Sequence, residues 1–243
     1  KVSNEGTFVS RYLRFFGIGE SRLVTDLEQL IEEQTNPTIA PYAGMYEVVL
    51  RLTANGDTKE ECEQFLDELE EKILSVEREY FYGYGEYETL LLITSELLKN
   101  SGLSIASAES LTGGLFASTL ISVEGSSQYV LGSCVAYQES VKKNQLQVPK
   151  EILETYGMVS AECAEEMAEN ARTIFGSDLG ISFTGIAGPS PMEEKEVGTV
   201  FISLADGVET KTIELHLARN RNGNREFAVQ YGLNELRKYL LKK

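Results

Sequence analysis

The sequence predicts an α/β protein of two domains, a small α+β domain followed by a larger domain built on a mixed sheet. Two observations lead to this prediction. The chain has 243 residues, which exceeds one typical domain of ~100–150 residues. From about residue 88 onward, strand-like and helix-like patterns alternate and include one hairpin, which is typical of a mixed sheet covered by helices on both faces.

The first part of the chain contains the smaller domain. Residues 1–20 show no regular period, and we expect them to be a remnant of a preceding domain or a linker. Residues 21–87 show helical and alternating patterns that predict a small α+β unit. Its predicted elements are a helix over 23–31 that ends before Pro37, a strand over 45–53, a helix that begins after a capping box of Thr58 and Glu61, and a strand over 80–84.

The second domain is predicted to cover residues 88–243. Its elements follow from periodicity and from Gly, Pro and Ser residues at their ends. We expect helices over 88–99, from 115 to 122, from 140, over 149–157, over 160–176 and from 224, and strands over 103–107, 130–137, 179–184, 198–205 and 208–216.

Charge and composition exclude several classes of function. Lys and Arg total 22 against 38 Asp and Glu, a net charge of −16, which disfavours non-specific binding to nucleic acid or anionic membranes. No apolar run approaches the ~20 residues that a membrane span needs. The cysteines, Cys62, Cys134 and Cys163, are scattered and there is one histidine, so we expect no disulfide framework, no metal site and a cytoplasmic location.

Residues 108–114, with the sequence AESLTGG, follow a predicted strand. In an open α/β sheet, ligands bind beyond the carboxyl ends of strands. Ser110 sits where the strand turns into a helix, and free N–H groups at a helix start can hold an oxyanion or a phosphate. The alternative is that Ser110 is only a helix N-cap in a tight turn.

Residues 137–142, with the sequence YQESVK, also follow a strand. A lysine in a partly dry cleft can lose its proton and act as a base, which a serine nucleophile requires. Lys142 is therefore a candidate base and Tyr137 a candidate neighbour; the alternative is a solvated lysine beside an interfacial tyrosine. If Glu139 faces the site, we expect its charge to raise the pKa of Lys142.

The third such sequence is TGIAGP at residues 184–189. Its glycines permit turns that expose N–H groups, and Thr184 can orient a substrate amide; alternatively the segment is only the exit from a strand. Arginines near the start of the last helix can bind phosphate or pair with the acidic surface. These arginines are Arg219, Arg221 and Arg225.

Together, AESLTGG, YQESVK and TGIAGP resemble the motifs of the CinA family of competence/damage-inducible proteins. Residues 88–243 are similar to its C-terminal amidase domain, and residues 14–21 and 36–43 to its middle region. The resemblance implies a three-layer α/β/α sandwich for the second domain and a KH-like fold for residues 21–87. Longer members also carry an N-terminal domain resembling molybdopterin-binding proteins, which we expect to be absent apart from residues 1–20.

The resemblance further implies an amidase that hydrolyses the carboxamide of nicotinamide mononucleotide to nicotinate mononucleotide and ammonia, without a metal or other cofactor. It implies a homodimer with a small-molecule nucleotide substrate and no membrane partner. Ser110 matches the family's nucleophile and Lys142 its base. The predicted site consists of Ser110, Lys142 and Tyr137 for catalysis and of Thr112, Gly113, Gly114, Thr184, Gly185, Arg221 and Arg225 for substrate binding.

Two alternatives stay open. The chain can be a ligand-binding pseudo-enzyme of the same fold, or a non-catalytic nucleic-acid-binding module that uses the KH-like domain. KH domains clamp the nucleic-acid backbone with a GXXG loop. Residues 21–86 contain no GXXG and their predicted central helix is strongly acidic, so nucleic acid is the less favoured partner. The chain differs from the family's motifs at Glu139, at 190–192 and at 219–220.

Overall fold

A computed structural model describes residues 6–243 of the chain. The chain divides into two compact units, Lys1–Thr89 and Leu90–Lys243, which are described separately below. Within the described residues, none of the helices has the length and apolar character that crossing a membrane requires.

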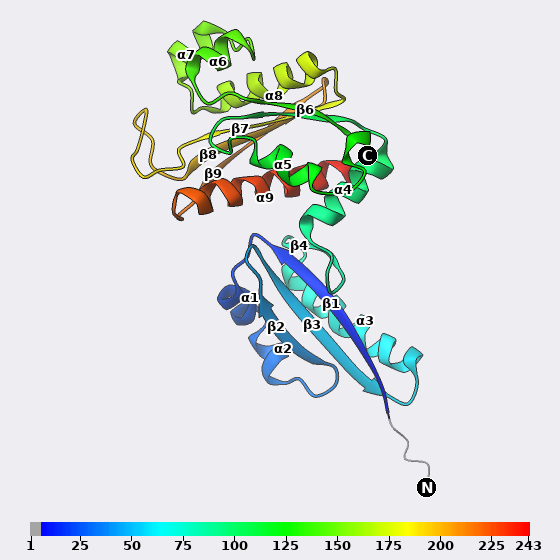
Figure 1. Cartoon of the computed structure of the whole chain (residues 1–243). Helices are drawn as coiled ribbons and strands as arrows, with labels where there is room; N and C mark the ends of the chain where they lie inside the picture. The colour runs from blue at the N-terminus through cyan, green and yellow to red at the C-terminus, as the bar shows by residue number, and fades with distance from the viewer. Residues whose placement is uncertain (1–5) are drawn as a thin grey trace. The chain divides into compact units, whose positions relative to one another are not determined.

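The first unit is a four-stranded antiparallel sheet with helices packed on it, in the strand order β2-β3-β1-β4. The core lies between the sheet and the helices, and Leu13, Leu50 and Leu66 are fully buried in it. The elements are β1 Thr7–Phe16, α1 Glu20–Asp26, α2 Glu28–Glu32, β2 Thr38–Ala43, β3 Glu47–Gly56, α3 Lys59–Glu77 and β4 Phe81–Tyr84 (Figure 1).

The expectation that residues 1–20 are a remnant or a linker is wrong for the described part of that segment; residues 1–5 lie outside the described residues. Strand β1 is a central strand that pairs with β3 over its whole length, from Thr7 opposite Gly56 to Phe16 opposite Glu47. Its last four residues are all buried, so the strand shows no simple alternation of apolar and polar residues. The domain therefore begins well before residue 21.

Two other features of this unit differ from expectation. The helix predicted over 23–31 is broken at Leu27, which separates α1 from α2. Strand β2 was not predicted. It contains Pro41, which is tolerated because β2 is an edge strand, where a backbone N–H can be missing. The predicted cap is present: the Glu61 N–H donates to Thr58 Oγ1 at 3.1 Å, while the Glu61 carboxylate accepts from the Asp57 N–H.

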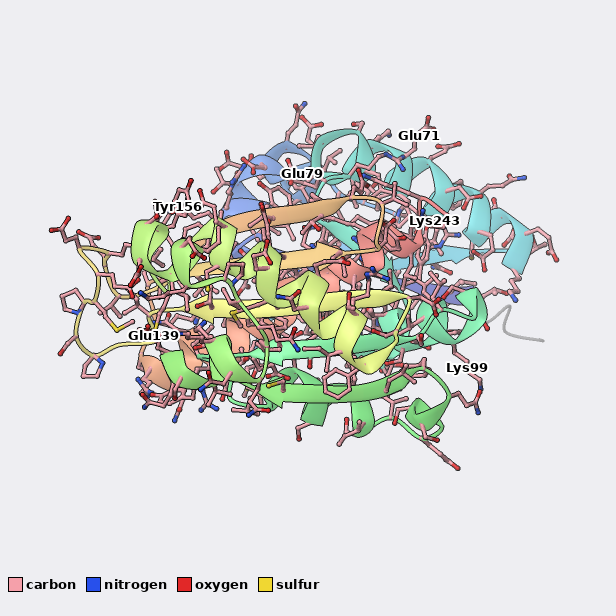
Figure 2. The ribbon with its side chains drawn as sticks, turned by 90° about the horizontal axis from the view of Figure 1, so that it is seen from above. Glu71, Glu79, Lys99, Glu139, Tyr156 and Lys243 are labelled. Atoms are coloured by element: carbon pink, nitrogen blue, oxygen red, sulfur yellow. The ribbon has the colours of Figure 1, made fainter. Side chains whose placement is uncertain are left out.

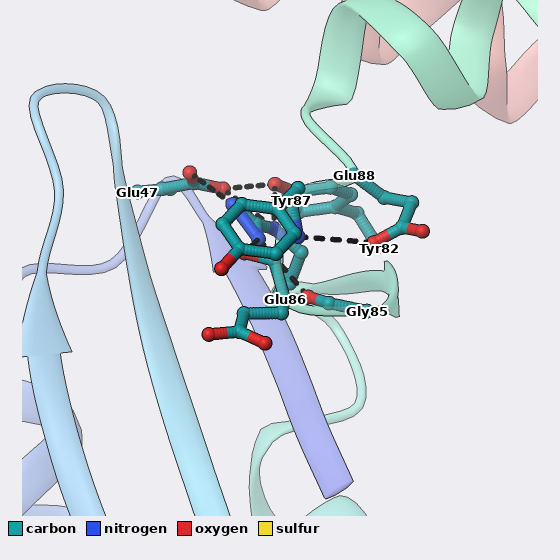
Figure 3. Close-up of polar contacts among 7 residues, drawn as sticks. Glu47, Tyr82, Gly85, Glu86, Tyr87 and Glu88 are labelled. Atoms are coloured by element: carbon teal, nitrogen blue, oxygen red, sulfur yellow. Dashed lines mark hydrogen bonds and ion pairs between the residues drawn. The ribbon is translucent and has the colours of Figure 1, made fainter.

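A buried arginine fastens the end of this unit. Arg14 is 5% exposed, and it donates to Glu47 Oε1 at 2.8 Å and to Tyr82 Oη at 2.9 Å. Its Nη1 donates to the carbonyl oxygens of Gly85 and Glu86, both at 3.0 Å (Figure 3). A buried guanidinium is costly unless its donors are matched. Here the segment after β4 supplies two of the acceptors.

The second unit is a three-layer α/β/α sandwich. Its five-stranded sheet has the order β6-β5-β7-β8-β9, in which β5 runs parallel to β6 and β7, and β7, β8 and β9 are antiparallel neighbours. Helices α6, α7 and α8 lie on one face and α4, α5 and α9 on the other (Figure 1). The elements are α4 Leu90–Ser101, β5 Ile105–Glu109, α5 Leu115–Ile121, β6 Val130–Val135, α6 Glu139–Asn144, α7 Lys150–Tyr156, α8 Ala161–Phe175, β7 Leu179–Gly185, β8 Thr199–Ala205, β9 Thr210–His216 and α9 Arg221–Leu240.

The parallel strands fix where the motifs meet. Because β5, β6 and β7 run in the same direction, the segments that follow Glu109, Val135 and Gly185 leave the sheet at one edge. Figure 2 shows Glu139 at this end of the second unit and Lys99 and Lys243 at the other end. All three predicted motifs are therefore brought together by the sheet.

Candidate active site

A pocket of about 370 Å³ opens at the carboxyl ends of the parallel strands. Four of the predicted site residues, namely Ser110, Tyr137, Gly185 and Arg221, lie on its wall. The remaining wall is made by Leu111, Gln138, Glu139, Met158, Ile186, Ala187, Gly188, Ser190 and Met192.

Ser110 is the first residue after β5. Its N–H donates to the Phe183 carbonyl of the neighbouring strand at 2.8 Å, and its carbonyl accepts from the Gly113 N–H at 3.1 Å. Gly113 and Gly114 have φ values of +63° and +91°, a region that glycine enters without a steric penalty. The two glycines thus allow the tight turn that leaves Ser110 at the pocket.

The buried carboxylate of Glu109 anchors this turn. Its oxygens accept hydrogen bonds from the N–H groups of Phe116 and Ala117 at 3.0 and 2.9 Å, in the first turn of α5. Ser107 and Ser133 also donate to it. The helix-start amides that the sequence suggested for an anion are therefore occupied by the protein itself. Sequence reasoning missed this role, although a glutamate at the end of an apolar strand was a visible signal.

Lys142 lies in α6 and is almost completely buried. Its Nζ lies 3.0 Å from both Thr184 Oγ1 and Met167 Sδ, and it donates to the Met158 carbonyl at 3.4 Å. Burial lowers the pKa of Lys142 from its ordinary value, because the charged form loses its hydration, while Cys163 and Glu193 oppose this shift. The shift is in the direction that favours a neutral amine, and the interpretation of Lys142 as a solvated surface lysine is wrong.

Thr184, near the end of β7, is buried beside the lysine. Its hydroxyl accepts from Lys142 Nζ and donates to the Met158 carbonyl at 2.6 Å. In the pairing of β5 with β7, Glu109 lies opposite Phe183. Ser110 and Thr184 are the residues that follow this pair, so both lie at the same end of the sheet. Thr184 therefore contacts the lysine, and neither Thr184 nor Lys142 is among the residues that line the pocket.

Tyr137 and Arg221 meet at the mouth of the pocket. Arg221 Nη2 donates to Tyr137 Oη at 2.9 Å, and Arg221 Nη1 donates to the Gly188 carbonyl. Both residues are exposed. This places one cation and one phenol where a ligand would enter.

The structure does not bring Thr112, Gly113, Gly114 or Arg225 to the wall of this pocket. Thr112 is fully buried, and its hydroxyl has no hydrogen-bond partner among the described residues. Arg225 holds the serine loop from behind: its Nε donates to the Leu111 carbonyl and its Nη2 to the Thr112 carbonyl, both at 2.9 Å. Arg225 therefore positions the loop.

The start of α9 also fastens the TGIAGP segment. Asn220 caps the helix through the Gly223 N–H at 2.9 Å, so α9 begins three residues before the predicted Asn224. Asn224 is buried and donates to the Ala187 carbonyl at 3.1 Å. Arg219 packs its guanidinium over the Phe227 ring at 3.6 Å. The role of Asn224 was missed, because its acceptor lies 37 residues away in sequence.

A carboxylate that acts on Lys142 is Glu193, and the expectation for Glu139 stays a prediction. Glu139 is exposed at the rim of the pocket. Glu193 lies in the segment after TGIAGP, and it raises the pKa of Lys142 against the effect of burial. In the part of the chain that the structure describes, no group of three or more His, Cys, Asp or Glu side chains could hold a metal ion.

Comparison with known families agrees with the fold and the motifs. The family model described as "CinA C-terminal domain" matches residues 87–240, and "Damage-inducible protein CinA KH domain" matches residues 10–83. The chain belongs to the CinA family. The KH match begins inside β1, in keeping with the place of that strand in the first sheet.

Similar sequences are competence-damage inducible proteins. One from Bacillus pumilus is 50% identical over 236 residues, covering 97% of this chain and 56% of its own length. One from Listeria monocytogenes serotype 4b is 46% identical over 232 residues, covering 95% and 56%. The chain thus spans about half the length of these curated relatives.

The solved structures that are similar to this chain each cover about two thirds of it. A CinA superfamily protein from Klebsiella pneumoniae has a TM-score of 0.62 and 26% identity, covering 64% of this chain and 100% of its own. One from Escherichia coli has a TM-score of 0.60 and 28% identity, covering 68% and 96%. In these two solved structures, the matched part makes up all or nearly all of the chain.

Proposed function

We propose that this CinA-family protein is an amidohydrolase that converts nicotinamide mononucleotide and water into nicotinate mononucleotide and ammonia. One observation carries the proposal: Ser110 lies on the pocket wall directly after β5, and the neighbouring strand β7 carries Thr184, whose hydroxyl accepts a hydrogen bond from a buried lysine whose pKa is lowered by burial. A neutral amine near a serine hydroxyl is the pairing that activates serine as a nucleophile.

In the first half of the reaction, Ser110 Oγ attacks the carboxamide carbon while Lys142 accepts the hydroxyl proton. The tetrahedral intermediate collapses as the C–N bond breaks, and the proton on Lys142 passes to the leaving nitrogen, which departs as ammonia. In the second half, Lys142 takes a proton from water, and the resulting hydroxide attacks the ester carbon. The Ser110–carbon bond breaks, nicotinate mononucleotide leaves and Ser110 regains a proton.

The oxyanion requires donors that the protein does not already use. The Gly113 N–H is bonded to the Ser110 carbonyl, and Glu109 occupies the Phe116 and Ala117 N–H groups. The N–H groups of Thr112 and Gly114 are our candidates for the oxyanion; neither residue lines the pocket, but both follow the wall residues Ser110 and Leu111 in the same turn. At the mouth, Arg221 is the candidate for the substrate phosphate, with Tyr137 beside it.

A cytoplasmic location and a homodimeric assembly are part of this proposal, because the substrate is a small intracellular nucleotide and the family resemblance implies a dimer. The KH-like unit has no catalytic role in it, since all the motif residues lie in the second unit.

Ammonia release from nicotinamide mononucleotide by the purified chain tests the proposal directly. We expect turnover that gives one ammonia for each nicotinate mononucleotide formed. Binding of the nucleotide without turnover would instead indicate a pseudo-enzyme. Absence of both, together with binding of single-stranded nucleic acid, would favour a nucleic-acid-binding module.

A further inference from the structure

We propose that Glu193 is a positioning residue, whose carboxylate latches the segment 189–197 onto the backbone of Met158 and Val159 and thereby fixes the Lys142 amine. This inference rests on the proposed function for its catalytic meaning. The contacts that support it are independent of which substrate the site accepts.

The latch is made of two hydrogen bonds to adjacent peptide groups. The N–H groups of Met158 and Val159 donate to the two oxygens of Glu193, each at 3.0 Å. Gly157 lies directly beneath the carboxylate, because a Cβ atom at that position would come within 2.5 Å of Glu193 Oε2. The carboxylate is therefore seated in a place where the backbone leaves room for it.

The backbone conformation of Glu193 is unfavourable for glutamate, which indicates that its two hydrogen bonds stabilise the turn. Met192 and Lys195 exchange both backbone hydrogen bonds, at 3.2 and 3.0 Å, across a two-residue turn. The two central residues, Glu193 and Glu194, have φ values of +51° and +58°, the conformation of a type I′ turn. Glycine, asparagine and aspartate favour such positions and glutamate does not. The two latch bonds offset the unfavourable conformation at Glu193.

The peptide group between Met158 and Val159 contacts Lys142 through its carbonyl oxygen. The Val159 N–H, which shares a peptide group with the Met158 carbonyl, donates to Glu193, while that carbonyl accepts from Thr184 Oγ1 at 2.6 Å and from Lys142 Nζ at 3.4 Å. Glu193 thus fixes the acceptor that orients both side chains. Displacing the carboxylate would free the Met158 peptide and, with it, the amine.

The same segment also forms part of the pocket. Ser190 and Met192 lie on the pocket wall, three residues and one residue before Glu193, in the segment that the latch holds. The shape of this wall and the position of the Lys142 amine therefore both depend on how the segment 189–197 is docked. This links occupancy of the pocket to the geometry of the base.

The negative charge of Glu193 affects the pKa of Lys142, which a purely steric contact would not do. The titratable groups that act on Lys142 are Cys163 of α8 and Glu193, while Glu139 of its own helix is exposed at the rim. Glu193 favours the charged amine and so raises the pKa of Lys142. Replacing the carboxylate with a neutral group of the same shape should move that pKa down.

The experiment compares Glu193→Gln and Glu193→Ala with Glu194→Gln and Glu194→Ala. Glu194 is an exposed neighbour in the same turn, so the controls change the same charge and the same side chain. In protein labelled with ¹³C at lysine, the Lys142 signal is assigned by its loss in Lys142→Arg and is titrated by NMR. The rate of ammonia release and KM are measured alongside, with a thermal melt for each variant.

We expect Glu193→Gln to lower the pKa of Lys142 by about half a unit or more, and Glu194→Gln to leave it unchanged. Glu193→Ala should lower kcat at least about tenfold, with Glu194→Ala within about twofold of the parent chain. Equal effects at the two positions, or an unmoved Lys142 titration in Glu193→Gln, would overturn the proposal. The NMR arm needs no substrate, so a failure of the amidase proposal would leave this test intact.

Discussion

The Lys142 amine donates a hydrogen bond to the Thr184 hydroxyl, 3.0 Å away, and that hydroxyl donates in turn to the Met158 carbonyl. The amine therefore meets an acceptor that is already oriented by the backbone. Because both side chains are buried, neither has water as a substitute partner.

Thr184→Val should lower kcat about tenfold or more with a smaller change in KM, because the amine loses an oriented partner while the pocket wall is retained. Thr184→Ser keeps the hydroxyl and should restore most of the rate. The valine variant should also lose about 1–3 kcal/mol of stability, since a buried donor is left unpaired. Initial rates and denaturant titrations of both variants measure these effects; identical behaviour of Val and Ser would contradict the role.

Ser110→Ala should abolish turnover and leave the fold intact. The turn is held by Gly113, Glu109 and Arg225, none of which needs the Ser110 hydroxyl. A residual rate above about a tenth of the parent rate would mean that the serine is only a cap, whose loss typically costs ~1 kcal/mol of stability. Steady-state assays and a thermal melt on the same preparation distinguish the two outcomes.

Lys142→Met should abolish activity and flatten the dependence of stability on pH. Burial lowers the folded-state pKa of Lys142, so the unfolded chain binds more protons between that pKa and the ordinary lysine value of ~10.4. The stability of the parent chain should accordingly rise with pH through this window, relative to the variant, and fall as pH decreases toward the folded-state pKa. Denaturant midpoints at several pH values measure the difference, and parallel curves would argue against a neutral buried lysine.

Arg221 and Arg225 should have opposite kinetic signatures, although they lie one turn apart on α9. Arg221 lines the pocket, so Arg221→Ala should raise KM about tenfold or more through loss of a charge-assisted contact. Arg225 holds the Leu111 and Thr112 carbonyls, so Arg225→Ala should lower kcat about tenfold with little change in KM. If Arg225→Ala raised only KM, it would be a substrate-binding residue, as the sequence first suggested.

Most of the second unit could be predicted from the sequence, because its helices and strands have strong periods and clear caps. The Ser160 cap, for instance, accepts from the Cys163 N–H at 3.1 Å where the sequence placed a helix start. Strand β1 could not be predicted in this way. Arg11 interrupts its apolar pattern, and that charge is neutralised by Glu63, Asp67 and Glu70, more than fifty residues away.

The same limit applies to the site. Residues on strand ends were found, because the order of strands and turns is local information. Glu193 was not found, since its partners Met158 and Val159 are 35 and 34 residues away in sequence. Arg225 was found, but its contacts with the Leu111 and Thr112 carbonyls were not, because an arginine that binds carbonyls of a loop and one that binds phosphate have the same sequence signature.

The contacts of Arg14 bear on how the two domains can be separated. Its guanidinium uses the carbonyls of Gly85 and Glu86, which lie beyond the last strand of the first sheet. A fragment that stops at Tyr84 would keep every strand and still leave a buried cation with two donors unmatched, which is expensive in free energy. A fragment that continues to Glu88 retains both acceptors. The folding boundary of the KH-like domain is thus set by a side chain near its beginning, several residues past the point where its secondary structure ends.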